Sequence, residues 1–327
     1  YVITRDATKI EPGNGKNAIL CNEKGGILND PVLLRIAQDE FWFSLSDSDL
    51  MLWLQGVNLS KKFDVEIDEI DVCPVQIQGP LSEDLMAKLA GEELRDIPYY
   101  GLMETNIEGA DVVISQTGFT GEKGYEIYVR DAHENAEIVW NAVLEAGEEF
   151  GLMVIAPAHH RRIAAGILSW GQDLDFETSP FQVNLSYQVP RNKEADYIGK
   201  DELERQRDVI DAGGFPFKMR MVGLTLGGKE ITDYAPDFWL IADTDGNDMG
   251  YITSPWWSPE LNTNIALGWV PYASSEIGTK LQVRLPDEYS ELPGVPVEGE
   301  VVDVPFRESV NPNKREVQKA KGLDYAD

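Results

Sequence analysis

The sequence predicts an α+β protein in which antiparallel sheets mixed with helices are followed by a small C-terminal antiparallel β-barrel. In the first part of the 327 residues, runs with alternating apolar residues are interspersed with amphipathic helical segments. From residue 218 onward, short apolar runs separated by turn residues dominate, which is typical of a barrel. We therefore expect one domain over 1–212, a linker over 213–217 and a barrel domain over 218–327 that ends in a polar tail after Arg307.

Alternation and helical periodicity locate the elements of the first domain. In the segment 132–151, apolar side chains recur on one helical face. The expected strands and hairpins are a hairpin over 18–36 with its turn at 23–26, and strands over 41–46, 73–80, 110–114 and 125–129. The expected helices cover 47–56, with Ser46 or Asp47 as the cap, 82–89, 132–151, 158–169 and 201–211.

The expected barrel consists of six short strands. They cover 221–226, 238–242, 249–253, 265–270, 280–285 and 297–304. The segment Ser254-Pro-Trp-Trp-Ser-Pro-Glu-Leu, with its two prolines, is expected to be a loop of this barrel.

Charge and composition exclude several classes of partner. The chain has 57 acidic and 28 basic residues, a formal net charge of -29, so its surface repels nucleic acids and anionic membranes. The two cysteines and three histidines show no metal-ligand spacing, so no metal is expected. The chain has neither an apolar run of transmembrane length nor a secretory leader, so the expected location is cytoplasmic.

The motif around which the chain is organised is Ser115-Gln-Thr-Gly-Phe-Thr-Gly-Glu-Lys-Gly-Tyr-Glu-Ile-Tyr-Val129. It reads as the end of a strand, a glycine-rich turn and a second strand. The glycines allow a positive φ or the close approach of a flat ligand, and Glu126 emerges beside the turn. A carboxylate there can accept two parallel N–H bonds from a planar donor. An ordinary glycine-rich hairpin with a solvated Glu126 is the structural alternative.

The segment Thr117-Gly-Phe-Thr-Gly-Glu-Lys-Gly-Tyr-Glu126 resembles the signature of the folate-binding T-protein family, which contains the aminomethyltransferase of glycine cleavage and related demethylases. The resemblance implies a T-protein-like first domain and tetrahydrofolate as the methyl acceptor. It also implies that Phe119 lies against the pteridine, that Glu126 clamps its aminopyrimidine edge, and that Tyr100 and Arg162 help to hold the folate. It further implies that several tens of residues precede Tyr1.

Asn29 and Asp30 follow the Gly25-Gly26 turn at the place where T-proteins carry two aspartates. In that family the first aspartate is regarded as the group that handles the reacting folate nitrogen. An amide cannot act as a general base at neutral pH, so Asn29 keeps hydrogen bonding but not proton transfer. We expect Asn29 and Asp30 to orient the reacting centre; the structural alternative is that both only form the turn.

Two further stretches bear on the branch of the family. Gly26-Ile-Leu-Asn-Asp-Pro-Val and Phe43-Ser-Leu-Ser-Asp-Ser-Asp-Leu resemble the tetrahydrofolate-dependent dimethylsulfoniopropionate demethylase branch. The glycine-rich motif and Gly171-Gln-Asp-Leu-Asp are closer to the aminomethyltransferase. Arg162 matches the second arginine of a T-protein helix whose first arginine is replaced here by Ala158. Folate binding and a structural ion pair are equally open for Arg162, and His159 and His160 read as capping or surface residues.

Aromatic residues accumulate after the helix that contains Arg162. Each of them alone is best explained by core packing. Together they suit an onium substrate, because a positive sulfonium or ammonium group lies favourably over an aromatic face. The residues expected to line the donor site are Trp170, Phe181, Tyr187, Trp256 and Trp257.

These features predict a tetrahydrofolate-dependent methyltransferase that demethylates an onium donor, with dimethylsulfoniopropionate as the leading candidate. The alternatives are an aminomethyltransferase of the glycine cleavage type and a demethylase of a methylamine, betaine or methoxylated aromatic. A non-enzymatic folate-binding protein of iron–sulfur assembly ranks last, because no cysteine lies between 196 and 203. The expected partners are folate and a small-molecule donor. A homodimer is left open, and a lipoyl carrier protein is required only by the aminomethyltransferase alternative.

Overall fold

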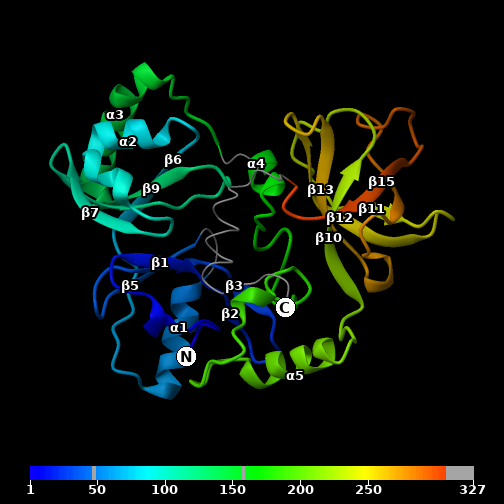
Figure 1. Ribbon diagram of the computed structural model, residues 1–327, viewed down its shortest axis with the longest axis horizontal. Helices are drawn as coiled ribbons and strands as arrows, with labels where there is room; N and C mark the ends of the chain where they lie inside the picture. Colours follow the sequence, from blue (N-terminus) through cyan, green and yellow to red (C-terminus); the bar gives the residue numbers. More distant parts are fainter. Residues whose placement is uncertain (46–48, 157–158, 307–327) are drawn as a thin grey trace.

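The computed structural model describes residues 1–45, 49–156 and 159–306. Figure 1 shows two layered regions built by the first part of the chain, with the barrel beside them and the short helix α4 (His159–Ala164) in the space between. The α+β prediction with a C-terminal antiparallel barrel is confirmed. Among the described residues, no helix combines the length and the apolar character needed to cross a membrane.

The first layer is a three-stranded antiparallel sheet in the order β1-β4-β5, formed by β1 (Asn14–Asn17), β4 (Val32–Arg35) and β5 (Phe41–Ser44). The predicted hairpin over 18–36 is divided, because only β2 (Leu20–Cys21) and β3 (Ile27–Asn29) pair with each other. The chain leaves this pair at Asp30-Pro31, where proline cannot donate to a ladder, and β4 joins the other sheet. Asn29 and Asp30 therefore lie where one sheet ends and the next begins.

The helix after this sheet, α1 (Leu50–Lys61), begins later than predicted and continues past Gly56. Its last residue is Lys61, and the capping residue Lys62 takes a left-handed conformation with a φ of 55°. The proposed caps Ser46 and Asp47 lie outside the described residues. Leu50 packs with Leu20 and Leu33 in the core between the helix and the sheet.

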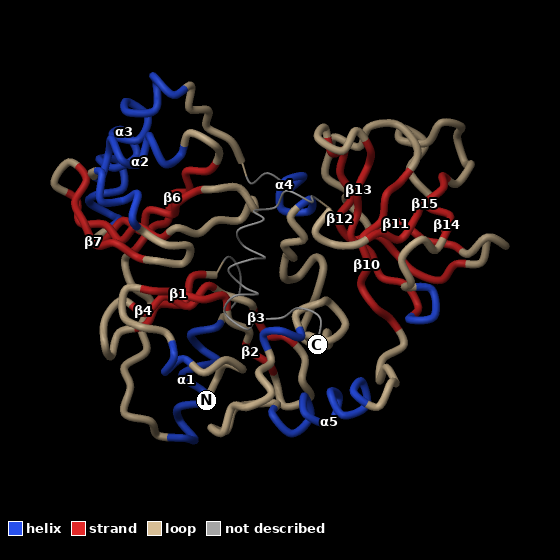
Figure 2. The backbone as a smooth tube through the Cα atoms, in the orientation of Figure 1, coloured by secondary structure: helices blue, strands red, loops and turns tan. Residues whose placement is uncertain are grey.

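The second sheet has the order β6-β9-β8-β7 and is entirely antiparallel. Helices α2 and α3 cover one face of this sheet, and their apolar sides contact Ile77, Ile114 and Ile127 (Figure 2). The other face packs against the first sheet through Leu34, Trp42, Val113 and Tyr128. The elements are β6 (Val72–Gln78), α2 (Ser82–Ala90), β7 (Leu102–Ile107), β8 (Ala110–Ser115), β9 (Gly124–Arg130) and α3 (Ala132–Gly147).

The barrel is closed in the order β10-β13-β12-β11-β14-β15. Its strands are β10 (Met219–Leu226), β11 (Trp239–Ala242), β12 (Asp248–Ser258), β13 (Thr263–Pro271), β14 (Lys280–Val283) and β15 (Val297–Val302). The prediction of a loop at 254–257 is wrong, because these residues extend β12 and pair with 264–267 of β13. Strand pairing over two long strands outweighs the local turn preference of proline.

The segment between α4 and the barrel packs into a core that joins the first part of the chain to the barrel. The helix predicted over 158–169 ends at Ala164, and Gly166 follows with a φ of 70°, which stops it. Ile163, Leu168 and Leu174 pack with Leu267 and Trp269 on the outer face of the barrel. Helix α5 (Lys200–Asp211) then leads to the barrel. Single 3-10 turns occur at η1 (Ala7–Lys9), η2 (Glu92–Asp96), η3 (Glu148–Phe150), η4 (Ser186–Gln188) and η5 (Tyr272–Ser274).

Candidate active site

Glu126 lies inside the protein, in the middle of β9, and is 7% exposed. Its Oε1 accepts a hydrogen bond from Gln76 Nε2 at 2.8 Å, and its Oε2 accepts from the hydroxyls of Thr117 and Tyr128. Burial raises the pKa of the Glu126 carboxyl, and the three hydrogen bonds oppose that rise. The alternative that Glu126 is a solvated glutamate of an ordinary hairpin is therefore wrong. Gln76 is the donor to Oε1 given above, so a second lone pair of this oxygen can accept a hydrogen bond from a further N–H group.

The glycines of the motif have a role that the sequence did not indicate. Gln78 of β6 inserts its side chain between Gly118 and Gly124, so that a Cβ at either position would collide with it. Its Nε2 donates to the carbonyl of Thr117 at 3.1 Å, and its Oε1 accepts from Thr120 at 2.8 Å. These two glycines hold the turn against Gln78, whereas Gly121 alone takes a positive φ, of 70°.

Phe119 lies in the loop between β8 and β9 and is half-buried. Gln76 and Gln78 point to the same face of β6 because they are two residues apart, and they contact Glu126 of β9 and the loop residues Thr117 and Thr120, respectively. That alternation was visible in the sequence and could have identified both glutamines as partners of the motif.

Asn29 and Asp30 occupy the end of β3. Asn29 is 3% exposed, and its Oδ1 accepts from the backbone N–H of Asp30 at 3.0 Å. Burial raises the pKa of Asp30 to about 7, and the nearby carboxylate of Asp173 adds to the rise. Asp30 is thus a carboxyl group that can hold or release a proton near neutral pH.

Tyr100 connects the glycine-rich turn with the surroundings of Asp30. Its backbone N–H donates to the carbonyl of Gln116 at 3.1 Å, next to Thr117. It takes a left-handed conformation with a φ of 66°, which costs about 1 to 3 kcal/mol for a residue with a side chain. Burial raises the pKa values of Tyr100 and Tyr187, which lie within electrostatic range of each other. Tyr187 is also within range of Asp30.

Arg162 is completely buried, and all five N–H groups of its guanidinium have protein partners. Nη1 donates to Asp173 at 2.7 Å and to the carbonyl of Ile167 at 3.1 Å, and Nη2 donates to Ser254 at 2.8 Å and to Gln172 at 3.4 Å. The remaining Nε donates to His159 Nδ1 at 3.2 Å. Of the two roles open for Arg162, these contacts support the structural ion pair and leave no donor for folate.

Two of the expected donor-site aromatics belong to the core between the regions. Trp170 donates from Nε1 to the carbonyl of Ile27 at 3.0 Å, so its half-buried indole lies against the strand that ends in Asn29. Phe181 is buried in the core shared with the barrel, and Arg207 lies 5.4 Å from its ring centre. Trp170 is therefore close to the candidate reacting centre, whereas Phe181 acts as a packing residue.

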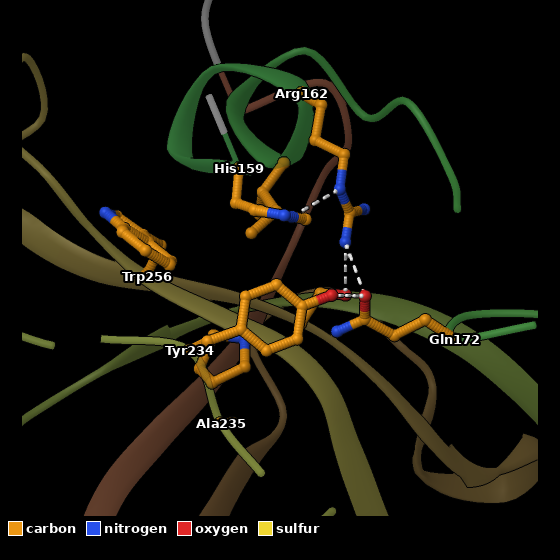
Figure 3. Close-up of a pocket in the computed structure, with 9 residues that line it drawn as sticks. His159, Arg162, Gln172, Tyr234, Ala235 and Trp256 are labelled. Atoms are coloured by element: carbon orange, nitrogen blue, oxygen red, sulfur yellow. Dashed lines mark hydrogen bonds between the residues drawn. The ribbon is translucent and has the colours of Figure 1, made fainter. Parts of the chain in front are cut away.

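Trp256 and Trp257 do not form one wall. They are consecutive residues of β12, so their side chains point to opposite faces of the strand. Trp256 stacks against His159 with ring centres 6.0 Å apart, beside Tyr234, whose hydroxyl donates to Gln172 at 2.6 Å (Figure 3). The cavity that these residues line measures about 10 Å³, which is room for a single water molecule. The expected joint donor site of the two tryptophans is therefore corrected.

No group of three or more His, Cys, Asp or Glu side chains in residues 1–45, 49–156 and 159–306 has an arrangement that could hold a metal ion.

Two domain profiles match the sequence. The one described as GCVT N-terminal domain matches residues 1–193, and the one described as glycine cleavage T-protein C-terminal barrel domain matches residues 220–306.

Individual relatives agree with these matches. The dimethylsulfoniopropionate demethylase of Ruegeria pomeroyi is 35% identical over 266 residues, which cover 81% of this chain and 70% of the relative. An aminomethyltransferase of Clostridium botulinum strain Loch Maree is 30% identical over 293 residues, covering 87% and 75%. The crystal structure of the glycine cleavage system aminomethyltransferase T from Bartonella henselae superposes with a TM-score of 0.75 at 24% identity, over 94% of this chain and 80% of that one. This last similarity is one of fold.

Proposed function

The chain belongs to the glycine cleavage T-protein family, and we propose that within it the protein is a demethylase that moves a methyl group from an onium donor to tetrahydrofolate. Members of this family are folate-dependent methyl or aminomethyl transferases, which supports a transferase activity for this chain. Dimethylsulfoniopropionate is the leading donor because it is the substrate named for the relative with 35% identity. A cytoplasmic location stays a prediction from the sequence, and a homodimer stays open.

The observation that carries the proposal is the buried amide of Asn29 beside the protonatable carboxyl of Asp30. A methyl group on a positive sulfur or nitrogen needs no acid to expel its leaving group, because that group departs neutral. Alignment is then the main demand on the protein. An amide at position 29 can supply alignment but cannot act as a base, so the site fits methyl transfer better than a reaction that requires a base there.

The residues around Glu126 fit a reduced pterin. Its Oε1 keeps an accepting position in a buried environment, where a hydrogen bond to an N–H group is strong. Phe119, half-buried in the adjacent loop, would offer its face to a flat ring. Tetrahydrofolate, when bound, supplies the nucleophilic nitrogen N5.

The chain's own groups would divide the remaining work. Asn29 would orient the reacting centre by hydrogen bonds, and Asp30 would take up the proton that methylation releases, since its pKa of about 7 allows it to be ionised at the start. Trp170 and Tyr187 would face the positive donor, with a contribution of roughly 0.5 to 2 kcal/mol for each cation–π contact.

The test is incubation of the protein with tetrahydrofolate and a panel of methylated compounds, followed by mass detection of 5-methyltetrahydrofolate. The panel contains dimethylsulfoniopropionate, glycine betaine, trimethylamine and a methoxylated benzoate. Product from an onium compound supports the proposal. Absence of product from every donor, in a protein that binds tetrahydrofolate, would reject it. A non-enzymatic role would be favoured only if the aminomethyl carrier described below also gave no product.

Aminomethyl transfer is the second candidate, because relatives named aminomethyltransferase are about as similar over a larger share of this chain. In that reaction Asp30 would have to replace the missing carboxylate at position 29. Supplying an aminomethyl-loaded lipoyl carrier protein tests it directly. Methylenetetrahydrofolate formed by the unaltered protein would establish this activity, and formation only by Asn29→Asp would show that the natural chain has lost it.

A further inference from the structure

Arg5 is a cation with open donor groups beside the candidate reacting centre. Its side chain is half-buried, and its guanidinium carbon lies 5.9 Å from the centre of the Tyr187 ring. Its Nε makes one long hydrogen bond, of 3.5 Å, to Gln188 Oε1. Within the part of the chain that the structure describes, its two Nη groups have no hydrogen-bond or ion-pair partner.

This lack of a partner is unusual in so acidic a chain. There are 57 carboxylate side chains for 28 cationic ones. The buried guanidiniums of Arg162 and Arg35 have partners for both Nη groups, which in Arg35 are the backbone carbonyls of Ile10 and Gln38, although Arg35 Nε has none. Partial burial of a charge without a counter-charge is unfavourable, so the position of Arg5 is best explained by an anion that arrives with a ligand. The planar fork of a guanidinium matches a carboxylate group.

The charges around Tyr187 indicate which group the ligand carries besides its carboxylate. The Arg5 guanidinium lies 5.9 Å from the Tyr187 ring centre, and Tyr187 is also within electrostatic range of Asp30, so a positive and a negative group both lie near this aromatic residue. The influences on the Asp30 carboxyl are burial, a backbone hydrogen bond and Asp173, so Arg5 is not its ion-pair partner. A molecule with a carboxylate at one end and a sulfonium or quaternary ammonium at the other would satisfy Arg5, Tyr187 and Asp30 together.

We propose that Arg5 binds the carboxylate of the methyl donor, so that the substrates of this site are zwitterionic onium carboxylates. This inference rests on the proposed demethylase function and narrows it. It excludes cations without a carboxylate, such as trimethylsulfonium and tetramethylammonium, as efficient donors. It also makes Arg5 a specificity-determining residue that the sequence did not single out.

The experiment compares the unaltered protein with Arg5→Met, Arg5→Lys and Arg220→Met. Arg220 is a matched control, because it also makes a single hydrogen bond to a side-chain amide, that of Asn184 at 3.1 Å, and lies 6.0 Å from an aromatic ring centre, that of Phe215. Each protein is assayed with dimethylsulfoniopropionate and with trimethylsulfonium. Tetrahydrofolate affinity and thermal unfolding are measured alongside to show that the fold and the folate site are intact.

The expected result is a rise of roughly 10- to 100-fold in KM for dimethylsulfoniopropionate in Arg5→Met, partial recovery in Arg5→Lys and no change in Arg220→Met. The KM for trimethylsulfonium should be high in all four proteins. Equal losses with both donors in Arg5→Met, or no loss, would overturn the inference.

Calorimetric binding of the thioether product 3-(methylthio)propionate separates the inference from the proposed function. Binding that Arg5→Met weakens, in a protein that forms no 5-methyltetrahydrofolate, would reject the demethylase and keep Arg5 as a carboxylate site. Binding that Arg5→Met leaves unchanged, or absence of binding to the unaltered protein, would reject the role of Arg5 whatever the activity.

Discussion

Arg162 donates a hydrogen bond from Nη1 to Asp173 Oδ2 over 2.7 Å, and both side chains are completely buried between helix α4 and the barrel. The second oxygen of Asp173 accepts from Thr253 at 2.6 Å and from Ser254 at 2.5 Å, both in β12. The ion pair therefore ties the first region of the chain to the barrel. A buried charge that loses its partner is strongly destabilising, which gives this relationship a measurable consequence.

We expect Arg162→Met to lower the free energy of unfolding by about 3 to 5 kcal/mol, because it leaves the Asp173 carboxylate buried and unpaired. Urea unfolding measures this change. Arg161→Met is the control, since its partly exposed ion pair with Glu122, at 3.2 Å, should contribute about 1 kcal/mol or less. A selective loss of folate affinity at unchanged stability would instead show that Arg162 binds folate.

Glu126→Gln should lower tetrahydrofolate affinity by roughly 10- to 100-fold while the protein stays folded, because a neutral amide is a weaker acceptor than a buried carboxylate. Calorimetric titration gives the affinity, and the thermal unfolding curve reports on the fold. Glu104→Gln, which removes an exposed carboxylate that pairs with Arg130 on the same sheet, should leave the affinity unchanged. Equal affinities in Glu126→Gln and the unaltered protein would remove Glu126 from the folate site.

Gly124→Ala should destabilise the protein by about 1 to 3 kcal/mol, because the new methyl group would displace the Gln78 side chain and break its hydrogen bonds. In the double variant Gly124→Ala with Gln78→Ala, the two effects should not add, since the collision no longer exists. Strict additivity would contradict the contact.

Gly56→Ala is the matched control for that glycine. It lies in α1 with nothing within 4 Å of an added Cβ, and the change should stabilise the protein by about 0.5 to 1 kcal/mol. A loss of stability there would mean that the α1 surface is covered in the folded protein.

The pKa of Asp30, about 7 in the folded protein against an ordinary 3.8, predicts a pH-dependent stability. Because the folded pKa is raised, the stabilising contribution is complete below the unfolded pKa and is lost as the pH rises through about 7. The free energy of unfolding should therefore fall by about 1 to 3 kcal/mol more between pH 5 and pH 8 in the unaltered protein than in Asp30→Asn, since partial solvent contact weakens the effect. Parallel pH profiles for the two proteins would show that Asp30 titrates normally.

The parts of the fold that depend on local pattern could be predicted from the sequence. The strand–turn–strand unit of β8 and β9 and the helix α5 follow from alternation and helical periodicity, and the structure contains both. The predicted helix over 158–169 was too long because the sequence alone did not show that Gly166 would take a positive φ.

The parts of the site that depend on distant contacts could not be predicted. Gln78 reaches the motif from another strand, and Asp173 meets the barrel residues Thr253 and Ser254 only after the whole chain has folded. The sequence predicts a loop at Trp256 and Trp257 and places both in the donor site, whereas strand pairing in β12 puts them on opposite faces. Local preference gives way to tertiary pairing at each of these positions.

The central claim is methyl transfer from an onium carboxylate to folate, and a label in the transferred group tests it most directly. The protein is incubated with tetrahydrofolate and dimethylsulfoniopropionate whose S-methyl groups are deuterated, and the folate product is analysed by mass. We predict 5-methyltetrahydrofolate that carries the intact deuterated methyl group, formed by the unaltered protein and far more slowly by Glu126→Gln at the same subsaturating folate concentration. Folate that binds but gains no labelled methyl group would contradict the account.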